Sequence, residues 1–332
     1  MTPTTKPFGT TGQQVSSMGL GCMGMSGTYG RSADEDAIRT LHRSLEMGCT
    51  FLDTADVYGS GHNEQLLGRA IAGKRSQVFL ATKFGLSGIS NSPGLLTVNG
   101  RPEYAQAACE ASLKRLQVDV IDLYYLHRLD KTVPIEETVG AMGRLVEQGK
   151  VRYLGLSEVS AATLERAHRA HPIAALQSEY SLWWTEPEAG ALPACRKLGV
   201  AFVAYSPLGR GMLAGKIQSP TELDEKDWRR VGPRFQAGAF EHNLQLTQAV
   251  SRMAARKGVS PGQIALAWLL HEGPEVFPIP GTKRIAYLEE NWQALNLTLT
   301  PEDRQELRDI MGAVEIQGHR YPERAAQLID QG

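Results

Sequence analysis

The chain has 332 residues, of which 42% are hydrophobic and 21% charged, and its formal net charge is −1. This size suits one large α/β barrel or two ordinary domains. The balanced charge excludes strong electrostatic attraction to nucleic acid or to anionic lipid. The apolar stretches are strand-sized, well short of the roughly 20 residues of a membrane helix. We therefore expect a protein that binds neither nucleic acid nor a membrane.

The compartment is predicted from the N-terminus and the cysteines. The first residues lack the basic segment and apolar core of a secretion signal. Cys22, Cys49, Cys109 and Cys195 are far apart and show no C-x-x-C spacing. We expect reduced, buried thiols rather than disulfides or a metal site, and a cytoplasmic protein.

The first half of the chain alternates apolar runs with amphipathic stretches. A Thr-Gly turn before Met18 predicts a hairpin that covers the bottom of the fold, and a short apolar segment follows it. The next apolar runs read as buried strands, and the stretches between them have helical spacing with acids or Pro in the first turn. The predicted strands lie over 49–53, 78–83 and 120–127, and the predicted helices over 34–48, 63–73, 102–116 and 134–150.

The second half repeats this scheme. Strands are predicted over 151–157, 173–178, 200–206 and 276–282, and helices over 161–170, 187–198, 243–257 and 285–295. Two further helices are predicted over 260–271, with Ser260 as N-cap and Pro261 in the first turn, and over 300–311. Eight strand–helix units without an intervening linker favour a closed (β/α)8 TIM barrel. We expect an α/β fold, with an N-terminal β-hairpin and extra helices, in which residues 1–332 form a single barrel domain.

A dinucleotide fingerprint is present but lacks its context. Residues 19–24, G-L-G-C-M-G, match G-x-G-x-x-G. In a Rossmann fold a helix begins within the glycine turn, so that the pyrophosphate meets its N-terminus. Here the next residues are loop-like and the helix starts only near Ala33. We therefore interpret the glycines as a tight strand end that lines a pocket.

Four polar side chains lie at or just after the ends of three predicted strands: Asp53, Tyr58, Lys83 and His127. The carboxyl ends of parallel strands meet at one face of a barrel, so these groups should share a pocket. Taken one at a time, Asp53 could simply cap a turn, Tyr58 could be an ordinary loop residue, and His127 could be a buried core residue. Lys83 is different, because a lysine at the end of a buried strand needs a partner for its charge. Together, a phenol beside a Lys–Asp pair and an imidazole can protonate a carbonyl oxygen.

These residues lie in motifs that resemble the aldo-keto reductase superfamily, nearly from end to end. The motifs are L-D-T-A-D-V-Y-G, A-T-K-F-G, D-L-Y-Y-L-H-R-L-D, V-R-Y-L-G-L-S, A-Y-S-P-L-G-R-G and P-I-P-G-T-K-R. H-R-L-D, S-P-L-G-R-G-M-L and P-R-F-Q look closest to the branch of perakine reductase-like, auxin-induced-like and bacterial pyridoxal reductase-like members. The resemblance implies reduction of aldehydes or ketones with NADPH, a small carbonyl substrate, and a catalytic tetrad of Asp53, Tyr58, Lys83 and His127. Lys83, kept charged by Asp53, should lower the pKa of the Tyr58 proton donor.

The resemblance also implies the cofactor contacts. Ser157 and Gln177 should bind the nicotinamide carboxamide, although Glu158 stands where the family often has Asn. Tyr205 should stack on the nicotinamide, and Ser206, Leu208, Gly209 and Arg210 should approach the pyrophosphate. At a helix N-terminus, Gly281, Thr282, Lys283 and Arg284 should meet the 2′-phosphate, and Glu290 and Asn291 the adenine.

Several points stay open at this stage. Loops over 25–29, 84–99 and 209–240, with Trp183, Trp184, Trp228 and Phe235, can line the substrate pocket or simply pack the barrel rim. NADP-linked alcohol oxidation is the alternative direction of the same chemistry. A nucleotide-sensing accessory subunit is an alternative from a different class. Assembly into a homo-oligomer is also left open.

Overall fold

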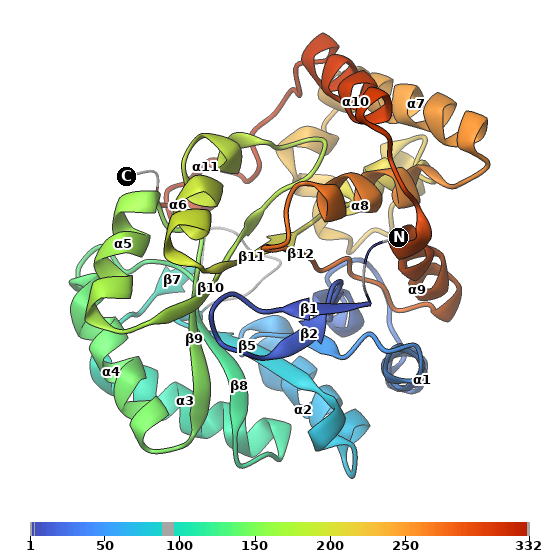
Figure 1. The fold of residues 1–332 in the computed structure, drawn as a ribbon. Coiled ribbons are helices and arrows are strands. Elements are labelled where there is room, and N and C mark those ends of the chain that lie inside the picture. The colour runs from blue at the N-terminus through green and yellow to red at the C-terminus, as the bar shows by residue number, and fades with distance from the viewer. Residues whose placement is uncertain (1, 3, 88–95, 331–332) are drawn as a thin grey trace.

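The computed structural model of the protein describes residues 2, 4–87 and 96–330. Eight parallel strands form one sheet, in which each pairs with the next strand around the fold (Figure 1). In spatial order they are β3 (Leu20–Gly21), β4 (Phe51–Asp53), β5 (Phe79–Phe84), β8 (Ile121–Leu126), β9 (Val151–Ser157), β10 (Ile173–Glu179), β11 (Ala201–Tyr205) and β12 (Val276–Pro278).

Glycines close the sheet into a barrel. Gly21 forms a parallel bridge with Gly281, and the Gly19 N–H donates to the Pro278 carbonyl at 3.0 Å, so the first strand meets the last. A Cβ on Gly19 would lie 2.9 Å from atoms of Phe51 and Ile279, which leaves no room for a side chain. The structure confirms the predicted (β/α)8 barrel, and it gives the G-x-G-x-x-G glycines a role in the seam of the barrel.

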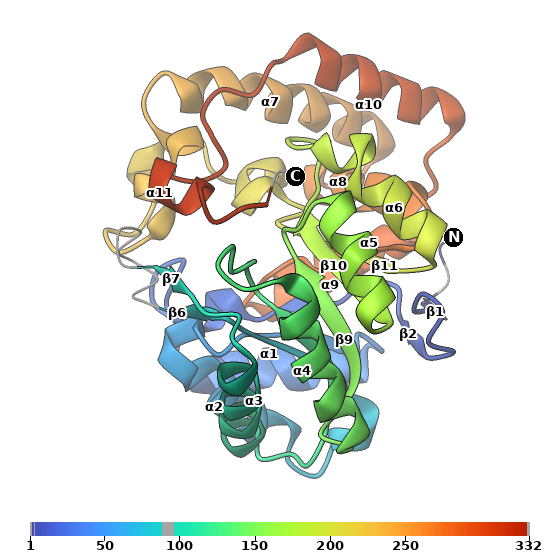
Figure 2. The same cartoon turned by 90° about the vertical axis from the view of Figure 1, so that its left-hand side faces the viewer.

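Helices surround the sheet (Figures 1 and 2). They are α1 (Asp34–Glu46), α2 (His62–Ile71), α3 (Pro102–Leu116), α4 (Ile135–Glu147), α5 (Ala161–Ala170), α6 (Ala191–Leu198), α7 (Ala239–Lys257), α8 (Pro261–His271), α9 (Ile285–Trp292), α10 (Pro301–Ala313) and α11 (Glu323–Ala326). The predicted cap of α8 is present, because the Ser260 hydroxyl accepts a hydrogen bond from the Gln263 N–H.

Two predicted helix boundaries are wrong. The helix expected over 187–198 is split into a 3-10 turn, η5 (Glu186–Ala189), and α6, with Gly190 between them. The helix expected from Asn243 begins at Ala239, because the Glu241 carboxylate accepts a hydrogen bond from the Gly238 N–H and so caps an earlier start.

The N-terminal hairpin seals the end of the barrel where the strands begin. It consists of β1 (Thr5–Pro7) and β2 (Gln14–Ser16), which pair antiparallel. The buried ring of Phe8 lies 5.8 Å from Phe51, 5.0 Å from Phe79 and 4.9 Å from Phe277, measured between ring centroids. Phe51 and Phe79 are the first residues of their strands. The predicted hairpin and its covering position are both confirmed. This end of the barrel is closed by aromatic side chains, so a site for polar reactions has to lie at the other end.

The loop predicted over 84–99 contains a second small hairpin, β6 (Leu86–Ser87) with β7 (Thr97–Val98), while its residues 88–95 lie outside the described residues.

All four cysteines are buried and unpaired. In the described part of the chain, no helix combines the length and the apolar character needed to cross a membrane. The same residues include no group of three or more His, Cys, Asp or Glu side chains placed to hold a metal ion.

Candidate active site

The site begins with a buried ion pair at the carboxyl ends of β4 and β5. The Lys83 side chain is fully buried, and its ammonium donates to Asp53 Oδ1 at 2.5 Å and to the Thr54 carbonyl at 2.7 Å. The same ammonium lies 3.3 Å from the Tyr58 hydroxyl. Tyr58 starts a 3-10 turn, η2 (Tyr58–Gly61), that directly follows β4. The three side chains predicted to act together are therefore in contact.

His127 completes this group from the end of β8. Its ring centroid is 5.9 Å from that of Tyr58, and the two rings are nearly perpendicular. Burial, followed by the positive charges of Arg128 and Lys83, lowers the pKa of His127 well below its usual range. The imidazole is therefore neutral at physiological pH. Its buried Nδ1 makes no hydrogen bond with any residue that the structure describes.

The pKa of Tyr58 departs from the sequence-based expectation. Burial raises it above the ordinary value, and the charge of Lys83 opposes this shift only in part. Burial alone would lower the pKa of Lys83, but Asp53 and Tyr58 reverse the direction, so the ammonium stays charged. Lys83 thus lowers the pKa of Tyr58 as expected, but the expected net lowering is wrong, because desolvation of the phenolate outweighs the effect of the ammonium. Tyr58 remains a protonated acid through neutral pH.

A cavity of about 670 Å³ opens above these residues at the carboxyl ends of the strands. All the predicted site residues line it except Lys83, which lies beneath its floor, and Gly209. The lining ones are Asp53, Tyr58, His127, Ser157, Gln177, Tyr205, Ser206, Leu208, Arg210, Gly281, Thr282, Lys283, Arg284, Glu290 and Asn291. The structure thus brings together groups from both halves of the chain.

The loop after β11 has an unusual backbone. Ser206 and Arg210 have φ of +49° and +57°, which side-chain-bearing residues rarely adopt, and Gly209 between them has φ of +55°. Ser60, inside the 3-10 turn η2, and Glu158, directly after β9, share this conformation. Such strained residues cluster at functional sites, where neighbouring contacts hold them.

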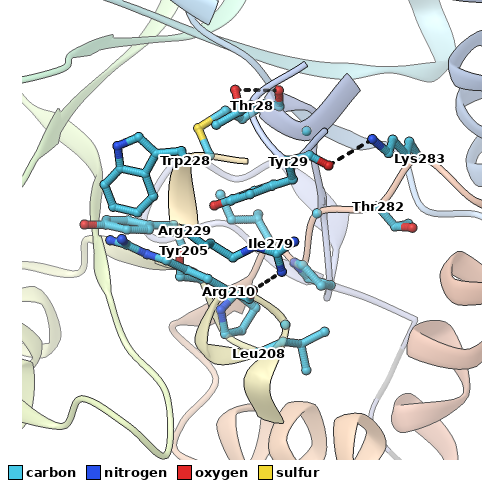
Figure 3. Close-up of a pocket in the computed structure, with 18 of the residues that line it drawn as sticks. Thr28, Tyr29, Tyr205, Leu208, Arg210, Trp228, Arg229, Ile279, Thr282 and Lys283 are labelled. Carbon is cyan, nitrogen blue, oxygen red and sulfur yellow. Dashed lines mark hydrogen bonds between the residues drawn. The ribbon is translucent and has the colours of Figure 1, made fainter. Parts of the chain in front are cut away.

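Lys283 and Arg284 have different surroundings. The Lys283 ammonium donates to the carbonyls of Tyr29, Gly30 and Arg31 at 3.1, 3.1 and 2.5 Å, which uses all three of its N–H groups. Figure 3 shows the contact with Tyr29, across the cavity from Arg210 and Trp228. Arg284 directly precedes α9, and its guanidinium lies 3.4 Å from the Tyr287 hydroxyl. Lys283 therefore secures a loop, while Arg284 has donors left for a ligand.

Gln177 and Ser157 are already engaged with neighbours. The Gln177 amide donates to Asp53 Oδ2 at 2.8 Å, and the Ser157 hydroxyl accepts from Arg128 at 3.2 Å. Glu158 is buried and binds the Arg320 guanidinium through two hydrogen bonds, both 2.9 Å long. The residue that departs from the family pattern is thus committed to an ion pair.

Three residues that sequence reasoning missed lie at this site. Arg128 lines the cavity next to His127, and Tyr321 lines it from the C-terminal segment, with its hydroxyl 2.7 Å from that of Tyr205. Arg320 adjoins Tyr321 and pairs with Glu158. Only Arg128 had a sequence signal, because an arginine directly after a buried strand end is unusual. The C-terminal pair lies in an irregular segment that no periodic pattern marks.

The aromatic residues considered for the substrate pocket divide into two groups. Trp228 and Tyr29 line the cavity, as do Leu86 and Leu96. Trp183 and Phe235 are buried against each other, with ring centroids 6.1 Å apart, and Trp184 does not line the cavity. The guanidinium of Arg210 lies between the rings of Trp228 and Tyr321, 4.5 and 4.7 Å from their centroids.

A closed (β/α)8 barrel with a Lys–Asp–Tyr–His group on the floor of its cavity is the architecture of an oxidoreductase that handles carbonyl groups. The sequence profile of the Aldo/keto reductase family matches residues 17–311, and the chain belongs to that family.

Known proteins of this family are similar to the chain over nearly its whole length. The chain is 44% identical to the aldo-keto reductase yakc [NADP(+)] of Schizosaccharomyces pombe, over 95% of this chain and 94% of that one. Among solved structures it resembles a glycerol dehydrogenase from Gluconobacter oxydans, at 30% identity and a TM-score of 0.85, over 95% of this chain and 97% of that one. It also resembles an aldo/keto reductase from Klebsiella pneumoniae solved with NADP and acetate, at 28% identity and a TM-score of 0.73, over 96% and 99%.

Proposed function

We propose that this protein is an NADPH-dependent reductase of aldehydes or ketones in which Tyr58 is the proton donor. The observation that carries the proposal is the contact between the Lys83 ammonium and both Asp53, at 2.5 Å, and the Tyr58 hydroxyl, at 3.3 Å, on the floor of the cavity. Family membership and the NADP(+) in the name of the S. pombe relative support the reaction class and the cofactor.

The four side chains have distinct tasks in this reaction. Tyr58 is protonated at neutral pH and gives its proton to the developing alkoxide oxygen of the substrate. Lys83 stabilises the phenolate that remains, and Asp53 keeps Lys83 charged. The neutral imidazole of His127, which lines the cavity, orients the carbonyl oxygen by a hydrogen bond. Bound NADPH supplies the hydride for the carbonyl carbon.

The residues of the cavity fit this cofactor. Tyr205 offers a ring beside the floor, and Ser157 and Gln177 offer polar groups there for a carboxamide. The strained loop from Ser206 through Leu208 and Gly209 to Arg210 presents backbone N–H groups and a cation for the pyrophosphate. At the N-terminus of α9, Gly281, Thr282 and Arg284 are suited to the 2′-phosphate, while Glu290 and Asn291 are assigned to the adenine. Lys283 acts indirectly, through the loop over 29–31.

Oxidation of an alcohol with NADP(+) is the second candidate, because the Gluconobacter relative is described as a glycerol dehydrogenase. Oxidation needs the phenolate and reduction the protonated phenol, so the raised pKa of Tyr58 predicts that the rate of oxidation increases with pH above neutrality.

We further propose that residues 1–332 act as one aldo-keto reductase-type barrel domain. The motifs H-R-L-D, S-P-L-G-R-G-M-L and P-R-F-Q support a place in the branch of perakine reductase-like, auxin-induced-like and pyridoxal reductase-like proteins. Four buried, unpaired cysteines suit the reducing cytoplasm.

The test is a panel of aldehydes and ketones assayed by loss of NADPH absorbance, with NADH in parallel. Tyr58→Phe should reduce turnover by at least about 10²-fold while NADPH binding, measured by fluorescence quenching, is retained. Near-normal turnover of this variant would overturn the role of Tyr58. NADPH binding without turnover of any carbonyl or alcohol would instead indicate a nucleotide-sensing subunit.

A further inference from the structure

Arg128 is a buried cation beside the reacting groups. It directly follows His127, lines the cavity, and is only 8% exposed. Its guanidinium donates to the His127 carbonyl at 2.7 Å, to the Ser157 hydroxyl at 3.2 Å and to the Tyr321 hydroxyl at 3.5 Å. All three acceptors are uncharged.

Four other arginines near the cavity differ from Arg128 in this respect, because each of them contacts a carboxylate. Arg210 and Arg234 bind Glu179, at 3.5 and 2.7 Å. Arg320 binds Glu158, at 2.9 Å, and Arg229 binds Asp227, at 2.6 Å. Among the residues that the structure describes, no carboxylate lies within ion-pair distance of Arg128.

The charges on the floor of the cavity therefore do not balance. Lys83 is offset by Asp53, Glu158 is offset by Arg320, and His127 is neutral. Arg128 has no carboxylate of its own, because Glu158 acts on it only from beyond ion-pair distance and is bound by Arg320. Because a buried charge is costly without a counter-charge, this position is suited to an anion that arrives with a ligand.

The cofactor does not supply that anion. Its charged groups are phosphates, which the proposed function assigns to the loop from Ser206 to Arg210 and to Arg284. Its nicotinamide end carries a neutral carboxamide. The other ligand that binds beside Arg128 is the carbonyl compound itself. The anion that would balance the charge of Arg128 is therefore part of the substrate.

We infer that the preferred substrates are carbonyl compounds that carry an anionic oxygen group, a carboxylate or a phosphate, which Arg128 binds beside His127. This inference rests on the proposed function and names the class of its substrate. The planar guanidinium can offer two parallel N–H donors to such a group, and this pairing fixes orientation as well as binding. Arg128 would thereby align the carbonyl with Tyr58 and His127.

The experiment compares anionic carbonyl compounds with neutral partners of similar shape. The pairs are 4-oxobutanoate with its methyl ester and glyceraldehyde 3-phosphate with glyceraldehyde, each assayed for kcat/KM with NADPH. In the wild type the anionic member of at least one pair should be preferred by about 10- to 100-fold, the range expected of a charged hydrogen-bonded pair. The pair that shows the preference distinguishes a carboxylate from a phosphate.

Variants locate the preference at Arg128. Arg128→Met should abolish it, so that the ratio of kcat/KM between the anionic and the neutral compound falls by about 10- to 100-fold. Arg128→Lys, which retains the charge without the fork, should restore it in part. Both variants should still bind NADPH, as measured by fluorescence quenching. Arg39→Met, which removes an exposed arginine of α1, is the matched control and should leave both pairs unaffected.

The outcomes separate this inference from the proposed function. Equal reduction of anionic and neutral compounds by the wild type overturns the inference alone. An equal loss for both compounds in Arg128→Met, together with weaker NADPH binding, also overturns it and makes Arg128 a cofactor residue. Reduction of no carbonyl compound overturns the proposed function, and the inference with it.

Discussion

Replacing Lys83 by Met tests the buried ion pair as a source of both stability and activity. Asp53 is 2% exposed, and in the variant it would keep the Gln177 amide at 2.8 Å but lose the ammonium at 2.5 Å. Breaking a buried pair by removing one partner costs about 3–5 kcal/mol, because the other charge stays buried and unpaired. Total stabilities are about 5–15 kcal/mol, so the loss should be plainly measurable. Turnover should also fall by at least about 10²-fold.

The measurement is urea unfolding followed by circular dichroism, with carbonyl turnover in parallel. The informative control is the double variant Asp53→Asn/Lys83→Met, which removes both charges. It should regain most of the lost stability, although the Thr54 carbonyl still lacks its donor. It should regain no turnover, because the phenolate of Tyr58 still has no cation beside it.

Two results would refute this reasoning. One is a Lys83→Met variant as stable as the wild type, which would mean that Asp53 is not stabilised by the ammonium. The other is a double variant no more stable than the single one, which would place the loss in packing rather than in charge. Tyr58→Phe serves as a reference, because it should lose turnover with little change in stability.

Three further predictions concern other parts of the molecule. The rate of reduction should stay level from about pH 6 to about pH 9 and fall only at higher pH, because the raised pKa keeps Tyr58 protonated and His127 is already neutral; a pH profile of kcat that declines through neutrality would contradict this. Phe8→Ala should destabilise the protein by about 3–5 kcal/mol in urea unfolding and leave kcat/KM unchanged, since Phe8 packs at the far end of the barrel; a matching loss of activity would disprove that separation. Lys283→Met should free the loop over 29–31 and speed NADPH release by about tenfold in stopped-flow fluorescence, and unaltered release would show that the loop does not retain the cofactor.

The sequence is sufficient to predict site residues that lie at the ends of strands. Asp53, Lys83 and His127 each come at the close of an apolar run, and the parallel barrel brings such positions to one face. The interpretation of the glycine motif as a strand end that lines a pocket is confirmed for Gly21, which ends β3 and lines the cavity.

The sequence was insufficient where irregular segments meet. Arg320 and Tyr321 reach Glu158 and Tyr205 from more than a hundred residues away along the chain, and neither lies in a helix or strand. The donors of Lys283 are directed to backbone carbonyls, which no motif reveals. The direction of the Tyr58 pKa shift depends on how deeply the phenol is buried, a property of the packed fold rather than of neighbouring residues.

The aromatic cluster of Phe8, Phe51, Phe79 and Phe277 lies at the opposite end of the barrel from the candidate active site. This cluster adds stability where the strands begin, whereas the reacting groups lie where the strands end. Substitutions that raise thermal stability can therefore be sought at the hairpin, and substitutions that change substrate specificity at the opposite rim. Because the two regions are far apart, the effects of the two sets of substitutions should be nearly additive.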